Sequence, residues 1–177
     1  MHLVFLSAEQ APDDSRMVLQ AVQQRLGFVP KLQAVLAHSP AALTLYAEGN
    51  MLLARSSLSA AERDVVFLVA SQVNGCGYCL AAHSSGTRLP TAVVEAIRDG
   101  RAIAGEPRLS ALQCFVEKLI ENRGDVGEAA LSDFVGAGYT LPQALDILVA
   151  LSLKTLTNYT ARLFAVPLDS EFAASPQ

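Results

Sequence analysis

Residues 74–83 read NGCGYCLAAH and place two cysteines three positions apart, with a histidine four positions after the second. Residues three and four apart are neighbours on one face of a helix, so a helix over Cys76 to His83 would bring these side chains together. Asn74-Gly75 is a turn signal that places Cys76 in the first helical turn, where the helix dipole favours a negative sulfur. A thiol beside a base that can take its proton is typical of a reactive thiolate. The stretch therefore predicts a redox dithiol.

Two other interpretations of the cysteine pair stay open at this point. Free cysteine behaves as a small hydrophobic residue, so the pair could belong to the core. The pair could also be half of a zinc site, but the remaining candidates, Cys114, His2 and His38, lie at no metal-like spacing. We expect Cys114, between Leu112 and Phe115, to be a core residue.

The composition of the 177 residues bounds the class of protein. Hydrophobic residues make up 51% of the chain and charged residues 17%, and alanine and leucine dominate the apolar fraction, which favours helices around a sizeable core. The net charge of −4, with scattered basic residues, argues against a nucleic-acid surface. We expect no membrane span, since apolar runs are short. We expect no signal peptide either, since residues 1–8 have no basic segment ahead of their apolar run. Three cysteines, an odd number, fit a reducing cytoplasm better than a disulfide scaffold.

Start and stop signals divide the chain into helices, and we expect no strand. Ser59-Ala60-Ala61-Glu62 is a capping box, and the helix that it begins is apolar on nearly every side to about Val73, so it should be central. Further helices are expected over residues 13–26, 31–37, 40–56, 76–85, 90–99, 110–122, 127–135 and 140–164. We expect one all-α domain over residues 1–177, with 1–57 as an N-terminal helical extension and 58–177 as the core that carries the CxxC motif and the C-terminal helices.

Three further side chains have more than one interpretation. Asp64 lies 12 residues before Cys76 and could approach His83 to orient its imidazole, although an acid in a first helical turn also complements the helix dipole. Tyr78, between the cysteines, could hydrogen-bond a substrate oxygen or simply cover the dithiol. Lys154, in the apolar last helix, could extend its ammonium to solvent or face a subunit interface.

These residues carry a resemblance to a known family. The run LSAAERD at residues 58–64, followed by residues 74–83, resembles the AhpD-like alkylhydroperoxidases of the carboxymuconolactone decarboxylase superfamily, most closely its peroxidase-related branch. Residues 27–30, 37–40 and 158–169 look like that branch as well. The resemblance implies an all-α fold that assembles into homo-oligomers such as dimers, trimers or hexamers. It also implies reduction of an organic hydroperoxide or hydrogen peroxide in antioxidant defence, without a bound cofactor or metal.

The resemblance further implies a role for each site residue. Cys79 would be the attacking thiolate and Cys76 the resolving thiol, while His83 would accept the proton from Cys79 and Asp64 would support that relay. The reductant would be a dithiol, such as a lipoyl-bearing or thioredoxin-like protein. The family usually has glutamate where this chain has Asp64, which shortens the reach by over ~1 Å.

Helix geometry supports the same assignment of the two sulfurs. Cys79 is one turn from His83 and Cys76 about two turns, so we expect Cys79 to have the lowered pKa. We also expect Cys79 to be the more buried thiol, because apolar residues 80–82 follow it whereas Cys76 lies at a glycine-flanked helix entry. The alternative function is a non-catalytic redox sensor or an oligomeric thiol–disulfide protein. A carboxymuconolactone decarboxylase-type lyase is less expected, because that chemistry gives the two cysteines no role.

Overall fold

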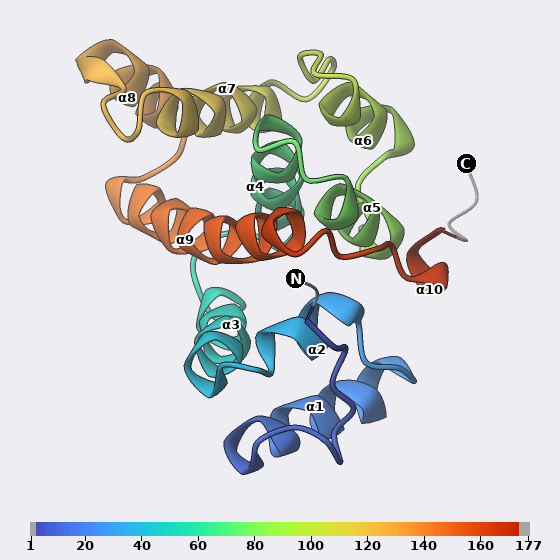
Figure 1. The fold of residues 1–177 in the computed structure, drawn as a ribbon. Coiled ribbons are helices and arrows are strands. Elements are labelled where there is room, and N and C mark those ends of the chain that lie inside the picture. Colours follow the sequence, from blue (N-terminus) through green and yellow to red (C-terminus); the bar gives the residue numbers. More distant parts are fainter. Residues whose placement is uncertain (1–2, 174–177) are drawn as a thin grey trace.

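The computed structural model describes residues 3–173 and contains only helices and connecting segments over that range (Figure 1). The all-α class expected from the sequence is therefore confirmed. His2 lies outside the described residues. The helices are α1 (Asp13–Leu26), α2 (Lys31–Leu36), α3 (Pro40–Leu53), α4 (Ala60–Val73), α5 (Gly77–Gly86), α6 (Thr91–Arg98), α7 (Pro107–Glu121), α8 (Gly127–Gly136), α9 (Leu141–Leu163) and α10 (Ser170–Ala173).

Helix α4 occupies the centre of the larger of two hydrophobic clusters. It begins at the expected capping box, in which the Ser59 side chain accepts from the Glu62 N–H and the Glu62 side chain accepts from the Ser59 N–H. Its residues Val65, Val66 and Leu68 are fully buried, and it packs against α5, α6, α7 and α9. The continuous apolar surface of α4 is thus used on every side, as its sequence predicted.

A second cluster joins the N-terminal helices to the dithiol. Residues of α1, α2 and α3 pack there with Ala161 of α9 and with Cys76, Tyr78 and Cys79. Figure 1 shows α9 crossing the middle of the molecule, with α1 to α3 on one side and α7 and α8 on the other. The segment before residue 58 therefore closes over the dithiol and contributes to its surroundings.

The turn between α4 and α5 has the geometry that its sequence indicates. Gly75 has a φ of 63°, in the left-handed region that favours glycine. The Cys76 N–H donates to the Ser71 carbonyl at 2.8 Å, which satisfies a carbonyl at the end of α4. This turn directs α5 back against α4 and fixes the position of the first cysteine.

Two expectations about α7 are wrong. The helix begins at Pro107, which takes the first helical position that suits proline, and not at residue 110. Cys114 is exposed and is not a core residue. The buried face of α7 consists of Leu112, Gln113, Phe115, Val116 and Leu119, so residue 114 falls on the opposite side.

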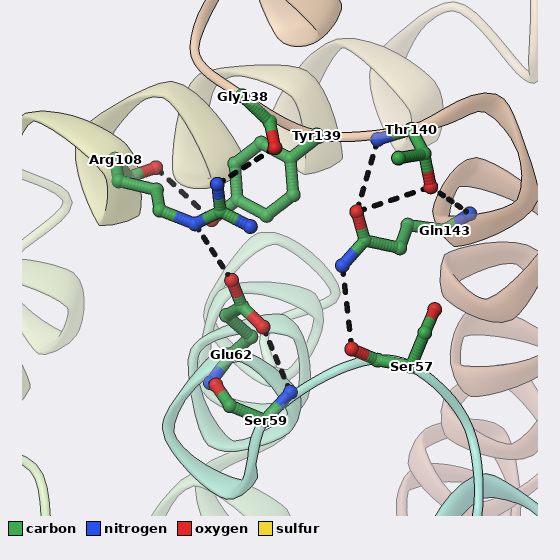
Figure 2. A network of polar contacts seen from close by, with 8 residues as sticks. All are labelled: Ser57, Ser59, Glu62, Arg108, Gly138, Tyr139, Thr140 and Gln143. Atoms are coloured by element: carbon green, nitrogen blue, oxygen red, sulfur yellow. Dashed lines mark hydrogen bonds and ion pairs between the residues drawn. The ribbon is translucent and has the colours of Figure 1, made fainter.

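A polar network ties the starts of α4, α7 and α9 together (Figure 2). Arg108 donates from Nε to Glu62 Oε1 at 3.0 Å and from Nη1 to the Gly138 carbonyl at 2.8 Å, and its guanidinium lies over the Tyr139 ring. A second capping box, between Thr140 and Gln143, begins α9. Gln143 also donates to the Ser57 carbonyl at 3.3 Å, which connects this box to the start of α4.

No single helix among the described residues has the length and apolar character needed to cross a membrane. Helices α8 and α9 meet these criteria only as a pair, and they are bent by 109° at their junction.

The ion pair between Glu62 and Arg108 generates a stability prediction. Burial alone would raise the pKa of Glu62, but hydrogen bonds from the Ser59 N–H and from Arg108 hold it below its ordinary value of 4.5. Glu62→Gln keeps the capping box and removes the charge, so it should lower the free energy of unfolding by about 1 kcal/mol near neutral pH. Because the folded pKa is lowered, this difference should shrink as pH falls below 4.5. Urea unfolding across pH measures both effects.

The matched control is Glu128→Gln on α8, an acid in a first helical turn. It has no arginine partner among the described ion pairs and should have a smaller effect. An equal loss of stability in both variants would contradict a specific contribution from the Arg108 pair.

Candidate active site

The two cysteines meet at the start of α5, and both are free thiols. Cys76 is the N-cap residue of the helix, and its sulfur accepts a hydrogen bond from the Cys79 N–H at 3.4 Å. Each residue is only 2% exposed, so the expectation that Cys79 is the more buried of the two is not confirmed. Cys76 is buried because the capping contact turns its side chain back over the first turn, beneath the N-terminal helices.

The order of thiol acidity is the reverse of the expectation. A hydrogen bond from the Cys79 thiol is the main reason that the pKa of Cys76 is lowered to about 6. Burial opposes this change, while the Cys79 N–H and nearby cations add to it. The pKa of Cys79 is raised, because its thiol donates to Cys76 and is itself buried. The predicted low pKa of Cys79 is therefore wrong. The hydrogen bond between the two sulfurs, followed by the Cys79 N–H and nearby cations, decides which thiol is the more acidic.

Lys154 of α9 places a buried positive charge beside the dithiol. It is 3% exposed, and its ammonium lies 5.7 Å from the centre of the Phe67 ring. Burial lowers the pKa of Lys154, while the two cysteines act in the opposite direction. No carboxylate pairs with Lys154 among the described residues. Both sequence interpretations of this lysine, solvent exposure and a subunit interface, are therefore wrong. Its charge instead favours a thiolate in the neighbouring dithiol.

His83 is close to the dithiol but has little basicity. Its ring packs against Phe67, with the ring centres 4.8 Å apart. Burial and the charge of Lys154 hold the pKa of His83 well below its ordinary value of 6.5. The imidazole is thus neutral near pH 7 and able to accept a proton, but only as a weak base.

Asp64 is not placed beside His83. Its carboxylate accepts a hydrogen bond from the Thr87 hydroxyl at 2.7 Å, and Thr87 follows the end of α5, one turn beyond the histidine. Burial raises the pKa of Asp64, against the effect of this hydrogen bond. The expected contact between Asp64 and His83 is absent from the described residues, because the short side chain meets the Thr87 hydroxyl instead.

Tyr78 anchors the motif and does not offer its hydroxyl to a substrate. The hydroxyl donates to Asp169 Oδ2 at 2.6 Å and accepts from the Leu32 N–H at 3.3 Å. Burial and the bond to Asp169 raise the pKa of Tyr78. Of the two interpretations of this residue, the structure supports the packing role.

A cavity of about 420 Å³ opens above Cys79. Its wall includes Cys79, His83 and Lys154, whereas Cys76 does not line it. The chain from α1 to α3 contributes further residues to the wall, namely Arg25, Leu26, Pro30, Leu32, Gln33 and Tyr46. No group of three histidine, cysteine or acidic side chains among residues 3–173 is arranged to hold a metal ion. The site is therefore a buried dithiol in which the Cys79 sulfur faces a small-molecule cavity.

Comparison with known proteins agrees with this architecture. A family model described as the carboxymuconolactone decarboxylase family matches residues 37–116, which include the dithiol. A solved structure of an alkylhydroperoxidase AhpD core, an uncharacterized peroxidase-related protein from Ralstonia eutropha JMP134, is 25% identical with a TM-score of 0.86, covering 97% of this chain and 93% of that one. In sequence over residues 37–116 and in fold over most of its length, the chain is similar to AhpD-like proteins of the carboxymuconolactone decarboxylase superfamily.

Other members of this fold group are more distant. An uncharacterized peroxidase-related protein from Silicibacter sp. TM1040 is 24% identical with a TM-score of 0.80, covering 98% of this chain and 94% of that one. A variant of the debrominase Bmp8, in complex with 2,3,4-tribromopyrrole, is 14% identical with a TM-score of 0.78. The match covers 99% of this chain and 96% of that one. At these identities the likeness is one of fold. Curated protein sequences give no significant match.

Sequence reasoning missed two features of this site. Lys154 reaches the dithiol from a helix 75 or more positions away in sequence, although a lone lysine in an apolar helix was a usable signal. Tyr46 and Arg25 come from the segment expected to be an extension, and no local pattern marks them as part of a site.

The position of Lys154 predicts a change in thiol acidity. Lys154→Met removes the cation at similar volume, so the first pKa of the dithiol should rise from about 6 by about one unit. Ultraviolet absorbance of the thiolate, recorded against pH in a Cys114→Ser background, measures it. Arg162→Gln is the control, because this exposed arginine ranks below Lys154 in lowering the pKa of Cys76 and should shift it less. An unchanged dithiol pKa in Lys154→Met would contradict the role of this charge.

Proposed function

We propose that this protein is a thiol-dependent hydroperoxide reductase whose dithiol of Cys76 and Cys79 is oxidised to a disulfide. The observation that carries the proposal is the acidic dithiol beside a buried cation, with Cys79 at the wall of a cavity. The similarity to peroxidase-related proteins of the same fold supports the choice of a peroxide as oxidant.

The resting dithiol holds one proton near pH 7 and titrates as a pair. That proton lies on Cys79, which donates to the Cys76 thiolate. Since only Cys79 lines the cavity, we assign the attack to this sulfur, with its proton passing to Cys76 as the peroxide arrives. This direct transfer between sulfurs gives His83 an auxiliary role as a neutral, weak base.

The chemical steps balance when the dithiol gives two electrons to the peroxide and solvent supplies one proton. The Cys79 thiolate attacks the peroxide, a sulfur–oxygen bond forms and the oxygen–oxygen bond breaks. The alkoxide takes the proton held by Cys76 and leaves as an alcohol, while Cys79 becomes a sulfenic acid. The Cys76 thiolate then attacks that sulfur, and the hydroxide released takes a proton to become water. A dithiol reductant, which we propose to be a lipoyl-bearing or thioredoxin-like protein in a reducing compartment such as the cytoplasm, restores the thiols.

Because the two sulfurs have different proposed roles, substitution of each cysteine should change peroxide oxidation in a different way. Cys79→Ser should abolish peroxide consumption, because the remaining sulfur does not face the cavity. Cys76→Ser should allow a single, slower oxidation and leave a sulfenic acid on Cys79 that a dimedone-type probe can trap. Stopped-flow oxidation followed by mass spectrometry measures both. Cys114→Ser is the control and should match the wild type, since Cys114 is exposed on α7.

One result would reverse the assignment of roles. If Cys79→Ser keeps the full rate of the first oxidation and the probe labels Cys76, then Cys76 is the attacking sulfur.

A non-catalytic redox sensor is the second candidate function. The observation that favours it is the bond between Asp64 and Thr87, which leaves His83 without the carboxylate that the family relay expects. A sensor would be oxidised once by peroxide and would not be recycled rapidly by any dithiol reductant. Turnover with excess peroxide and a lipoyl or thioredoxin-type reductant separates the two functions.

We also propose that the protein forms a homo-oligomer through α3 and α9. These helices pack together and expose large apolar side chains, with Leu52 and Leu145 each 65% exposed and Leu141, Leu148 and Val149 also at the surface. Several exposed large apolar side chains on two packed helices favour association with a second copy.

The oligomer proposal predicts a measurable mass. Light scattering at micromolar concentration should give a multiple of 18.8 kDa. Leu145→Glu should reduce that mass, whereas Met17→Glu, at a solitary exposed methionine of α1, should not. A monomeric mass for the wild type would contradict the proposal.

A further inference from the structure

We propose that the cavity above Cys79 is built for organic hydroperoxides that carry a carboxylate, with Arg25 binding that carboxylate. The inference rests on the proposed function and extends it to a substrate class. It depends on three features of the cavity: the positive charge of its wall, the absence of an ion-pair partner for Arg25 among the described residues, and the apolar part of its lining.

The cavity wall is positive in a chain that is negative overall. The chain has 17 acidic and 13 basic residues, yet the wall contains Arg25 and Lys154 and no aspartate or glutamate. His83, the remaining titratable base of the wall, is neutral near pH 7. A concave site with one sign of charge raises the local concentration of ligands of the opposite sign. The wall therefore selects for an anion.

Arg25 is available to bind such an anion. Arg16, Arg101 and Arg108 each pair with a carboxylate, whereas Arg25 is exposed and forms no ion pair or side-chain hydrogen bond among the described residues. A guanidinium binds a carboxylate through two parallel hydrogen bonds, which fixes the orientation of the ligand as well as attracting it. Lys154, by contrast, is buried beside the sulfurs, so it suits the alkoxide that develops during the reaction.

The uncharged part of the cavity lining is mainly apolar. Leu26, Pro30, Leu32 and Phe172 contribute to it, and the volume of about 420 Å³ falls in the range of sites for organic ligands. Hydrogen peroxide would leave most of this surface in contact with water. A carbon chain between a hydroperoxide at Cys79 and a carboxylate at Arg25 would cover it and gain hydrophobic free energy.

Tyr46 adds a donor to the same wall. Its hydroxyl forms no hydrogen bond within the described part of the chain, and burial, followed by the nearby Cys79, raises its pKa, so it stays protonated. It can therefore donate to the peroxide oxygen that leaves as the alcohol.

The experiment compares two peroxides that differ in charge and by one methyl group. Stopped-flow kinetics would measure the second-order rate constant for oxidation of the reduced protein by a short-chain hydroperoxy carboxylic acid and by its methyl ester. The acid should react about tenfold faster at low salt, and the ratio should fall as ionic strength rises, because Arg25 is exposed. Arg25→Gln should bring the ratio close to one. Arg98→Gln, an exposed arginine on α6 outside the cavity, removes the same charge and should keep the ratio.

Several outcomes would overturn the substrate class. Equal rates for acid and ester in the wild type would do so, and so would a preference for the acid that survives Arg25→Gln. Fast oxidation by hydrogen peroxide, with the organic acid slower, would also contradict it.

A second measurement separates this inference from the proposed function. The corresponding hydroxy acid, which is the reduced product, should protect Cys79 from alkylation in the wild type and in Arg98→Gln, but not in Arg25→Gln. If no peroxide oxidises the dithiol, the reductase proposal fails, while this protection still supports an anion site at Arg25. Absence of protection in the wild type would overturn the anion site, whatever the peroxide kinetics show.

Discussion

The hydrogen bond from the Cys79 N–H to the Cys76 sulfur is the contact on which the site depends. An N-cap residue normally offers an oxygen to the unpaired N–H groups of the first turn. Here a thiolate takes that place, so the group that begins α5 is also the group that carries the redox chemistry. The same contact adds to the acidity of the first cysteine, which comes mainly from the hydrogen bond that the Cys79 thiol donates to it. It also accounts for the burial of Cys76, because the cap turns that side chain inward over the helix.

The rest of the fold holds this short contact in place from several directions. The left-handed Gly75 and the bond from the Cys76 N–H to Ser71 fix the entry of the chain into α5. Tyr78 is tied to Leu32 and Asp169, which attaches the motif to α2 and to the segment before α10. These constraints come from parts of the sequence far apart from each other. The N-terminal segment is thus part of the site as well as a cover over it.

Local signals in the sequence predicted much of this architecture. The capping box at Ser59 and the Thr140–Gln143 pair are complete within four residues, so the starts of α4 and α9 are where they were expected. The prediction of thiol acidity failed because acidity depends on which sulfur donates a hydrogen bond to the other and, after that, on charges from α9, and helix spacing alone does not contain that information. Cys114 was misplaced for a related reason: its apolar neighbours face the core, but its own helical position faces solvent. The contact between Asp64 and Thr87 was beyond sequence reasoning, since it depends on how far α5 extends past His83.

The buried ammonium of Lys154 has a consequence for the energetics of the redox cycle. In the reduced protein a thiolate compensates its charge, and in the disulfide that negative partner is gone. A buried charge without a partner is unfavourable, so the oxidised form loses electrostatic stabilisation that the reduced form keeps. The difference raises the reduction potential of the disulfide and makes it a stronger oxidant toward an incoming dithiol. It also links redox state to folding: the disulfide form should release a proton from Lys154 more easily and tolerate heat less well than the dithiol form. One lysine in an apolar helix thereby couples the ease of recycling to the stability of the whole fold.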